Sequence, residues 1–414
     1  MPSSPPDEAP LLRFTLPDGR PATLLVGDAS TVLSIDDTCV SSWDLAGRPY
    51  ALVRETGTYR RGLDGGLLCK RESTADGSRL RRRLSAADGE PIVEGARREA
   101  DAALEACHSE GGSRTAPEES AVARAVRRLQ AIVAMDARAL RDDTARFLAA
   151  SGPVGILPPD QYLALVVRVT EGCSWNACTF CSLYRDVPFR WKRPDELLAH
   201  LDALCAYFGS SIALRRSVFL GDANALCLAH DRLLPLFEAV AARFAGVPLY
   251  SFLDAWTGQR RSPSDWRDYA GLGLKRVYVG LETGDPGLLA WLEKPGSPLD
   301  AVDLVGALHD AGIAAGVIVL LGAGGERFAA AHAARTAEAL TAMQLGSDDL
   351  VYFSEYVDDP GLAYGQRAAG AEDLRPLPSA RCAEQRRAII DGIRTAPEAR
   401  PPRHATYDIR EFVY

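Results

Sequence analysis

Three cysteines lie within nine residues near the middle of the chain: Cys173, Cys178 and Cys181, in the run Thr170-Glu-Gly-Cys-Ser-Trp-Asn-Ala-Cys-Thr-Phe-Cys. Thiolates this close together, in a loop that contains glycine, can converge on one soft metal centre. A closed structural site needs four ligands, whereas three ligands leave one position for a reacting molecule. The spacing therefore predicts a metal centre with an open coordination position.

Two other kinds of centre are compatible with this spacing. A plant-type ferredoxin cluster uses the same C-x4-C-x2-C pattern with a distant fourth cysteine, for which Cys205 or Cys227 could serve. A structural zinc site could recruit one of these cysteines or a histidine. The alternative function is therefore a non-enzymatic iron–sulfur or zinc protein that transfers electrons or senses. Neither alternative explains why the three cysteines follow the first strand of a long β/α array.

Apolar runs typical of buried parallel strands alternate with amphipathic helices from Tyr162 onwards. This pattern predicts a parallel sheet, either an open doubly wound sheet or a partial barrel, because six strands are too few for a full eight-stranded barrel. In both architectures the chemistry lies at the carboxyl ends of the strands. The expected strands are residues 163–169, 217–220, 249–253, 276–281, 315–321 and 349–353. The expected helices are residues 194–208, 231–244, 264–269, 299–311 and 328–343.

The cysteine motif, at the end of the first strand of this array, resembles that of the radical S-adenosylmethionine (radical SAM) superfamily. The usual spacing there is C-x3-C-x2-C, and this chain resembles the Fe–S oxidoreductase-like members with a C-x4-C-x2-C loop. The resemblance implies that Cys173, Cys178 and Cys181 hold a [4Fe–4S] cluster whose fourth iron binds S-adenosylmethionine (SAM). It also implies an enzyme that reductively cleaves SAM to a 5′-deoxyadenosyl radical, which abstracts hydrogen from a small organic substrate that the sequence does not identify.

Later strand ends resemble the SAM-binding motifs of the same family. By this resemblance the glycine-rich end of the second strand, with Gly221, Asp222 and Asn224, receives the methionyl ammonium, and Glu282 lies nearest the ribose. Asp222 or Asn224 could instead cap the next helix, and Glu282 could be a cap or surface acid. A flavodoxin or ferredoxin is the implied external reductant. The residues implied to lie near the adenine are Phe180, which could also be a loop anchor in the core, Gly322 and Gly325.

The part of the chain before the array has a different texture. Short apolar runs punctuated by Asx-Gly steps predict an antiparallel β unit from Leu11 to about Ser85. Helices are expected at residues 91–106 and, as one long helix, from Pro117 to about Ala150. The expected fold is α/β: a partial (β/α)6 TIM-like barrel with an N-terminal antiparallel β unit, a helical connector and a short C-terminal extension. The expected segments are a disordered tail (1–10), a β-rich unit (11–108), a linker (109–118), a connector (119–160), the barrel (161–356) and a C-terminal segment (357–414).

Composition excludes several function classes. The 414 residues are 47% apolar and 25% charged, as in a soluble globular protein, and the net charge of −8 disfavours a surface built for nucleic acid or anionic membrane. No long apolar run and no signal peptide is apparent, so a cytoplasmic protein without membrane association is expected.

Basic residues are concentrated in the N-terminal unit, where residues 60–83 hold eight Lys or Arg against three Asp or Glu. This run is either a solvated face or a docking site for an anionic partner such as a phosphorylated substrate or RNA, although the overall acidity disfavours RNA. The aromatic end of the sequence, residues 407–414, is expected to dock on the folded protein.

Overall fold

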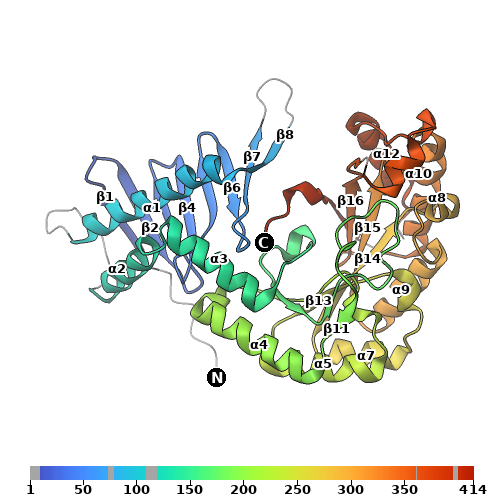
Figure 1. The fold of residues 1–414 in the computed structure, drawn as a ribbon, viewed down its shortest axis with the longest axis horizontal. Coiled ribbons are helices and arrows are strands. Elements are labelled where there is room, and N and C mark those ends of the chain that lie inside the picture. Colours follow the sequence, from blue (N-terminus) through green and yellow to red (C-terminus); the bar gives the residue numbers. More distant parts are fainter. Residues whose placement is uncertain (1–9, 73–78, 109–118, 360, 395–399) are drawn as a thin grey trace. The chain divides into compact units, whose positions relative to one another are not determined.

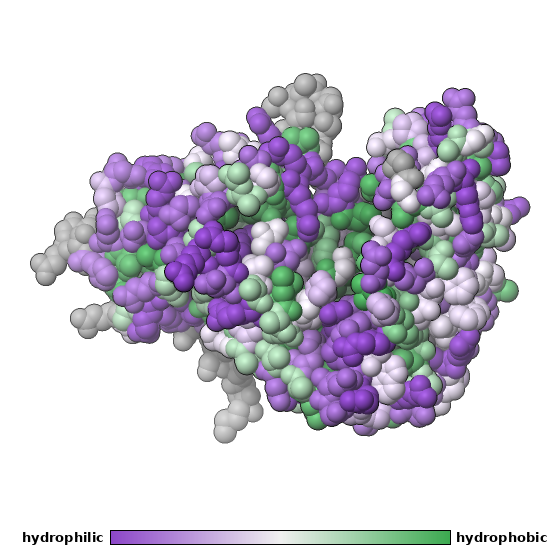
Figure 2. Space-filling model, viewed as in Figure 1, coloured by the Kyte–Doolittle hydropathy of each residue, from purple (hydrophilic) through white to green (hydrophobic). Residues whose placement is uncertain are grey.

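The computed structural model describes residues 10–72, 79–108, 119–359, 361–394 and 400–414 (Figure 1). By its contacts the chain divides into two compact units. Unit 1 comprises Met1–Pro153, Asp202–Arg216 and Arg410–Tyr414, and unit 2 comprises Val154–Leu201 and Ser217–Ile409. The expected linker at 109–118, and all but the last residue of the expected tail at 1–10, lie outside the described residues. In Figure 2, hydrophilic and apolar side chains alternate over the visible surface of both units.

Unit 1 contains the expected antiparallel sheet, an eight-stranded meander in which each strand pairs with the next. Buried and exposed residues alternate along its first strands, as the two-residue period of a sheet with one buried face requires. Asp18-Gly19 and Asp64-Gly65 lie in two of its turns, as predicted. The strands are β1 (Leu11–Thr15), β2 (Pro21–Val26), β3 (Ser30–Ile35), β4 (Cys39–Asp44), β5 (Pro49–Arg54), β6 (Gly57–Arg61), β7 (Leu67–Glu72) and β8 (Arg79–Leu84).

The helices of unit 1 are α1 (Ala86–His108), α2 (Glu119–Val133) and α3 (Ala137–Ser151). The prediction of one long helix up to Ala150 was wrong, because the helix is interrupted at residues 134–136. Asp136 caps a new helix there by accepting a hydrogen bond from the Ala139 amide at 2.8 Å. Side chains of α1 and α2 share one core with the sheet. Residues 119–151 therefore belong to the same compact unit as the strands.

The basic strands β6 to β8 bind the last residues of the sequence. Glu411 forms ion pairs with Lys70 and Arg81, and the Arg60 guanidinium donates to the Glu411 carbonyl at 3.0 Å. Arg83 donates to the carbonyl of Phe412 at 3.0 Å. The aromatic tail is docked as expected, since Phe412 and Tyr414 are buried. The anionic group that these basic residues meet in the structure thus belongs to the chain itself.

Unit 2 is built on a parallel sheet with the strand order β17-β16-β15-β14-β13-β12-β9. All neighbours in this sheet are parallel, and they follow one another along the chain. Right-handed crossovers that always advance in one direction put every helix on the same face, so the sheet is a partial barrel and is not doubly wound. Figure 1 shows these helices along the outside of the strands. The strands are β9 (Leu165–Arg168), β12 (Val218–Gly221), β13 (Leu249–Leu253), β14 (Leu274–Glu282), β15 (Ala314–Leu321), β16 (Leu350–Glu355) and β17 (Arg403–Thr406).

The six expected strands are present, and β17 is a seventh that was not predicted. Its four residues are partly or fully exposed, so no apolar run marks them in the sequence. The expected helices are also present, together with several short ones. The helices are α4 (Pro194–Phe208), of which the part from Asp202 onwards belongs to unit 1, α5 (His230–Arg243), α6 (Ala255–Gly258), α7 (Pro263–Gly271), α8 (Pro286–Trp291), α9 (Pro298–Asp310), α10 (Gly325–Ala342), α11 (Ala363–Ala368) and α12 (Ser379–Gly392).

One stretch among the described residues, Pro194–Leu214, is long and apolar enough to cross a membrane by length and composition. Core helices of soluble proteins meet the same criterion, so this is weak evidence for a membrane span. The side chains of Leu197, Leu201 and Leu204 in this stretch are fully buried within the protein.

Candidate active site

The three cysteines lie on a loop whose two ends are held together. Strands β10 (Thr170–Glu171) and β11 (Arg190–Trp191) pair antiparallel on either side of it, with Thr170 opposite Trp191. The amide of Lys192 donates to the Val169 carbonyl at 2.9 Å and extends the pairing. The loop therefore leaves β9 and returns to the same place before α4 begins.

Gly172 directs the chain into this loop. Its φ is +75°, and a Cβ at this position would lie 2.6 Å from the carbonyl oxygen of Val187. Both observations require glycine, because other residues rarely adopt this backbone conformation and the Cβ would overlap the returning strand of the loop. The glycine before the first cysteine is thus explained by backbone packing.

All three cysteines line one cavity of about 330 Å³ in unit 2. The other walls of the cavity come from the carboxyl ends of β13, β14, β15 and β16. Among the residues expected to bind SAM, Phe180, Asn224 and Glu282 also line this cavity. The sequence therefore predicted correctly that a loop after the first strand and polar residues after later strands come together at this edge of the sheet.

The donor set fits an iron–sulfur cluster. Burial raises the pKa of Cys178 to about 12 and also raises the pKa of Cys181, and Glu282 acts in the same direction, whereas Lys294 lowers both values. A bound cationic centre reverses this effect, since a coordinating thiol is deprotonated. Among the described residues, no group of three or more His, Cys, Asp or Glu side chains is placed to hold a single metal ion. A cluster does not require such convergence, because each thiolate binds a different iron atom.

An ion pair faces the cysteines from the end of β14. Lys294 Nζ lies 3.0 Å from Glu282 Oε1, and the two side chains are only 14% and 10% exposed. Glu282 has a φ of +58° next to an irregularity in the pairing of β14 with β15, and such bulges re-aim side chains near active sites. A Cβ at Gly280 would lie 2.5 Å from Glu282 Oε1 and 2.8 Å from Lys294 Nζ. Gly280 therefore leaves the space that the pair occupies.

The sequence analysis did not single out Lys294. It lies in a turn after the short helix α8, twelve residues beyond Glu282. No helical or strand period relates position 294 to position 282, so the two residues could not be paired from the sequence. The only local signal was that a proline directly follows Lys294.

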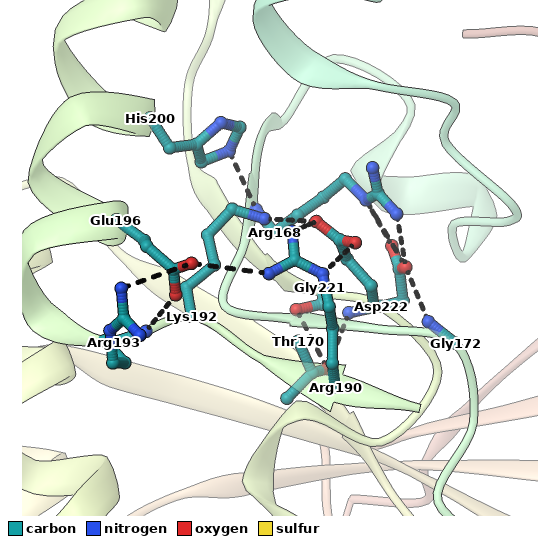
Figure 3. Close-up of polar contacts among 11 residues, drawn as sticks. Arg168, Thr170, Gly172, Arg190, Lys192, Arg193, Glu196, His200, Gly221 and Asp222 are labelled. Atoms are coloured by element: carbon teal, nitrogen blue, oxygen red, sulfur yellow. Dashed lines mark hydrogen bonds and ion pairs between the residues drawn. The ribbon is translucent and has the colours of Figure 1, made fainter. Parts of the chain in front are cut away.

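Asp222 has partners other than those the resemblance implied. Its carboxylate accepts hydrogen bonds from Arg168 Nε at 3.1 Å and from the Gly172 amide at 3.1 Å, and its own amide donates to Thr170 Oγ1 at 3.1 Å (Figure 3). Burial raises the pKa of Asp222, and the Arg168 guanidinium opposes this effect. Neither Asp222 nor Gly221 is among the residues that line the cavity. In the structure, Asp222 anchors the start of the cysteine loop to the end of β12.

Asn224 joins three parts of the site. Its amide Nδ2 donates to Ser174 Oγ at 2.9 Å and to Thr257 Oγ1 at 3.3 Å, and its Oδ1 accepts from the Asp254 amide at 3.2 Å. Its side chain makes no hydrogen bond that caps the turn that follows. The capping alternative therefore does not describe Asn224, which connects the cysteine loop to the start of α6.

Gly322 and Gly325, like Gly221 and Asp222, are expected residues that do not line the cysteine cavity. A Cβ on Gly322 would lie 2.7 Å from Cys382 Sγ, and one on Gly325 would lie 2.4 Å from the Arg375 carbonyl oxygen. Both glycines are thus required by close packing against the C-terminal segment, and neither lines the cysteine cavity. On this strand the cavity is lined by Ile318 and Leu320.

A second charged cluster stabilises the base of the loop. Lys192 Nζ lies 2.6 Å from Glu171 Oε1, and Arg190 Nε lies 2.7 Å from Glu171 Oε2. Burial raises the pKa of Glu171, but the hydrogen bonds from Lys192 and Arg190 outweigh it and lower the pKa to about 2. Glu171 therefore neutralises part of the positive charge that Arg190 and Lys192 bring to the end of the loop.

Residues 167–334 match the family model of the radical SAM superfamily. The chain contains a radical SAM domain. The match runs from the end of β9 into α10 and includes the three cysteines, the Asp222 anchor and the Glu282–Lys294 pair. The cofactors of this superfamily are a [4Fe–4S] cluster and SAM. Comparison with curated protein sequences gives no match.

Solved structures similar to this chain include radical SAM enzymes. The radical SAM methyltransferase TsrM from Kitasatospora setae is 16% identical, with a TM-score of 0.38, over 50% of this chain and 40% of that one. Methylornithine synthase PylB is 14% identical, with a TM-score of 0.40, over 60% of this chain and 66% of that one. Coproporphyrinogen III oxidase HemN from Escherichia coli is 17% identical, with a TM-score of 0.39, over 59% and 53%. The matched part thus spans less than two thirds of each of these chains.

Proposed function

We propose that this protein is an enzyme that reductively cleaves SAM at a [4Fe–4S] cluster and uses the resulting 5′-deoxyadenosyl radical to abstract hydrogen from a small organic substrate. The observation that carries this proposal is that Cys173, Cys178 and Cys181 line the same cavity as the Glu282–Lys294 pair. Three thiol donors leave an iron for SAM, and the ion pair offers a carboxylate and a cation beside it.

The chain's own residues have separable roles in this proposal. The three cysteines hold the cluster, which supplies the electron that cleaves the sulfonium of SAM. Glu282 accepts hydrogen bonds from ribose hydroxyls, and Lys294 fixes the orientation of that carboxylate. Asn224 keeps the cysteine loop next to the end of β12. Phe180, on the cavity wall, packs beside the adenine.

The remaining walls support a substrate of modest polarity. Phe252, Leu320, Tyr356, Leu362 and Tyr407 line the cavity with apolar and aromatic surface. Such walls exclude water from the place where the radical would form. We place the protein in the cytoplasm, where its reductant is a flavodoxin or ferredoxin, because the three cysteines must stay reduced to hold the cluster.

Anaerobic reconstitution tests the proposal. The protein should bind about four iron and four sulfide ions, and with dithionite it should convert SAM to 5′-deoxyadenosine. Replacing all three cysteines by alanine should abolish both results, while Cys382→Ala, at a buried position away from the cavity, should leave both unchanged. A reduced, fully loaded protein that does not cleave SAM would contradict the proposal.

The non-enzymatic alternative requires a fourth cysteine ligand. Cys227 lines a neighbouring cavity and is absent from the wall that the three cysteines share. We therefore expect Cys227→Ser and Cys205→Ser to retain the cluster. Loss of iron from either variant would favour the alternative.

A further inference from the structure

A second cavity, of about 310 Å³, adjoins the cysteine cavity in unit 2. The two cavities share Trp175, Asp254 and Pro295 in their walls. Trp175 follows Cys173 by two residues on the cysteine loop, and its indole donates to the Glu293 carbonyl at 2.8 Å. An aromatic side chain of the cysteine loop therefore lines both cavities.

Exposed aromatic surface is concentrated at this cavity. Trp175, Phe189 and Trp256 are 42%, 38% and 40% exposed, and they are the only exposed aromatic side chains in the described part of the chain. All three line the second cavity, and the Trp175 and Trp256 rings meet edge to face with centroids 6.2 Å apart. Exposed aromatic side chains gathered at one place are typical of surfaces that bind another molecule.

Two arginines give this surface a positive charge. Arg260 lies over the Trp256 ring at 4.3 Å, and Arg232 lies over the Trp191 ring at 5.6 Å. Both line the cavity, and neither forms an ion pair with a carboxylate of the residues that the structure describes. The one acid in the wall, Asp254, is occupied, since it accepts from the Thr257 amide at 2.9 Å. We call Trp175, Phe189, Arg232, Trp256 and Arg260 the tryptophan patch.

We propose that the tryptophan patch is the docking surface for a small acidic protein that delivers one electron to the cluster. The proposal rests on the proposed function. The patch fits this partner because its arginines complement an acidic surface, its aromatic side chains supply the apolar centre of an interface, and it shares a wall with the cysteine cavity. In the step itself, the reduced carrier loses one electron, the cluster gains one, and no atoms are transferred.

The test compares a charge reversal in the patch with one outside it. The variant is Arg232→Glu/Arg260→Glu, and the control is Lys275→Glu, an exposed lysine near the amino end of β14, the opposite end of the sheet from the cysteines. The probe is a purified bacterial flavodoxin. Its binding to the cluster-loaded protein is measured by calorimetry at low salt, and SAM cleavage is measured with reduced flavodoxin and, separately, with dithionite.

We expect the double variant to bind flavodoxin at least tenfold more weakly, to need correspondingly more flavodoxin for half-maximal SAM cleavage, and to match the wild type with dithionite. Added salt should weaken binding of the wild type more than of the variant. The proposal is overturned if the double variant and the control bind flavodoxin equally well. Failure of SAM cleavage even with dithionite would instead contradict the proposed function, and the binding comparison would still decide on the patch.

Discussion

Replacing Asp222 by asparagine removes the charge opposite Arg168 and keeps the size of the side chain. Both partners are buried, with side chains 9% and 4% exposed, so the guanidinium would be left without its carboxylate inside the protein. Removing one partner of a buried pair costs about 3–5 kcal/mol. Asparagine still offers one oxygen to the Gly172 amide, so we expect the lower end, about 3 kcal/mol.

This loss should appear first in the cysteine loop, because Asp222 joins the start of that loop to β12. A local cost of about 3 kcal/mol raises the frequency of loop opening roughly a hundredfold. Hydrogen exchange of the backbone at residues 169–192 measures the opening directly. Iron retention during dialysis against a chelator measures its consequence for the cluster.

The control variants distinguish an anchoring role from direct contact with SAM. If Asp222 anchors the loop, Arg168→Met should also increase exchange there, and Arg168→Met/Asp222→Leu should recover much of the loss because no unpaired charge remains. The reasoning would be refuted if Asp222→Asn weakened SAM binding without changing exchange while Arg168→Met changed neither. That result would indicate that the Asp222 carboxylate binds the methionyl ammonium of SAM.

Three further predictions concern other parts of the chain. Glu282→Gln should weaken SAM binding to the reconstituted protein about tenfold, measured by calorimetry, since it removes a charged hydrogen-bond acceptor from the cavity wall. Burial lowers the pKa of His332 to about 4, so the neutral form is favoured in the folded state. Stability should therefore fall as the pH drops from about 6.5 to 4, by about 2 kcal/mol at pH 5, and in urea unfolding His332→Gln should lack this component. Glu411→Gln should lower the stability of unit 1 by about 1 kcal/mol in urea unfolding, because it removes two partly exposed ion pairs. An unchanged SAM affinity, an unchanged pH dependence or an unchanged midpoint would contradict the respective prediction.

The parallel strands were predictable because both of their faces are buried. The strands β9 and β12 are buried at every position, and such continuous apolar runs are distinct from the alternating pattern of unit 1. The strand β17 was not predictable, since its side chains are partly exposed and its place in the sheet depends on pairing with β16. The one-turn helices α6 and α8 are too short to show a helical period.

The site was predictable where a residue belongs to a motif at a strand end. The cysteines, Asn224 and Glu282 meet this condition, because topology alone brings the carboxyl ends of parallel strands together. Asp222 also belongs to a motif at a strand end. Its role, however, depends on Arg168, which precedes the cysteine loop and belongs to no motif.

The glycines show that a motif alone does not identify the group that uses the space beside the backbone. Gly280 lies near the end of β14 and Gly322 directly follows β15, and in each case a Cβ would overlap a side-chain atom at less than 3 Å. At Gly280 that atom belongs to the Glu282–Lys294 pair that faces the cysteines, whereas at Gly322 it is the sulfur of Cys382 in the C-terminal segment. A sequence shows that space is needed beside the backbone, but only the tertiary structure shows which group uses it. Cofactor contacts assigned to glycines by motif alone therefore require the geometry of the neighbouring segment before they can be accepted.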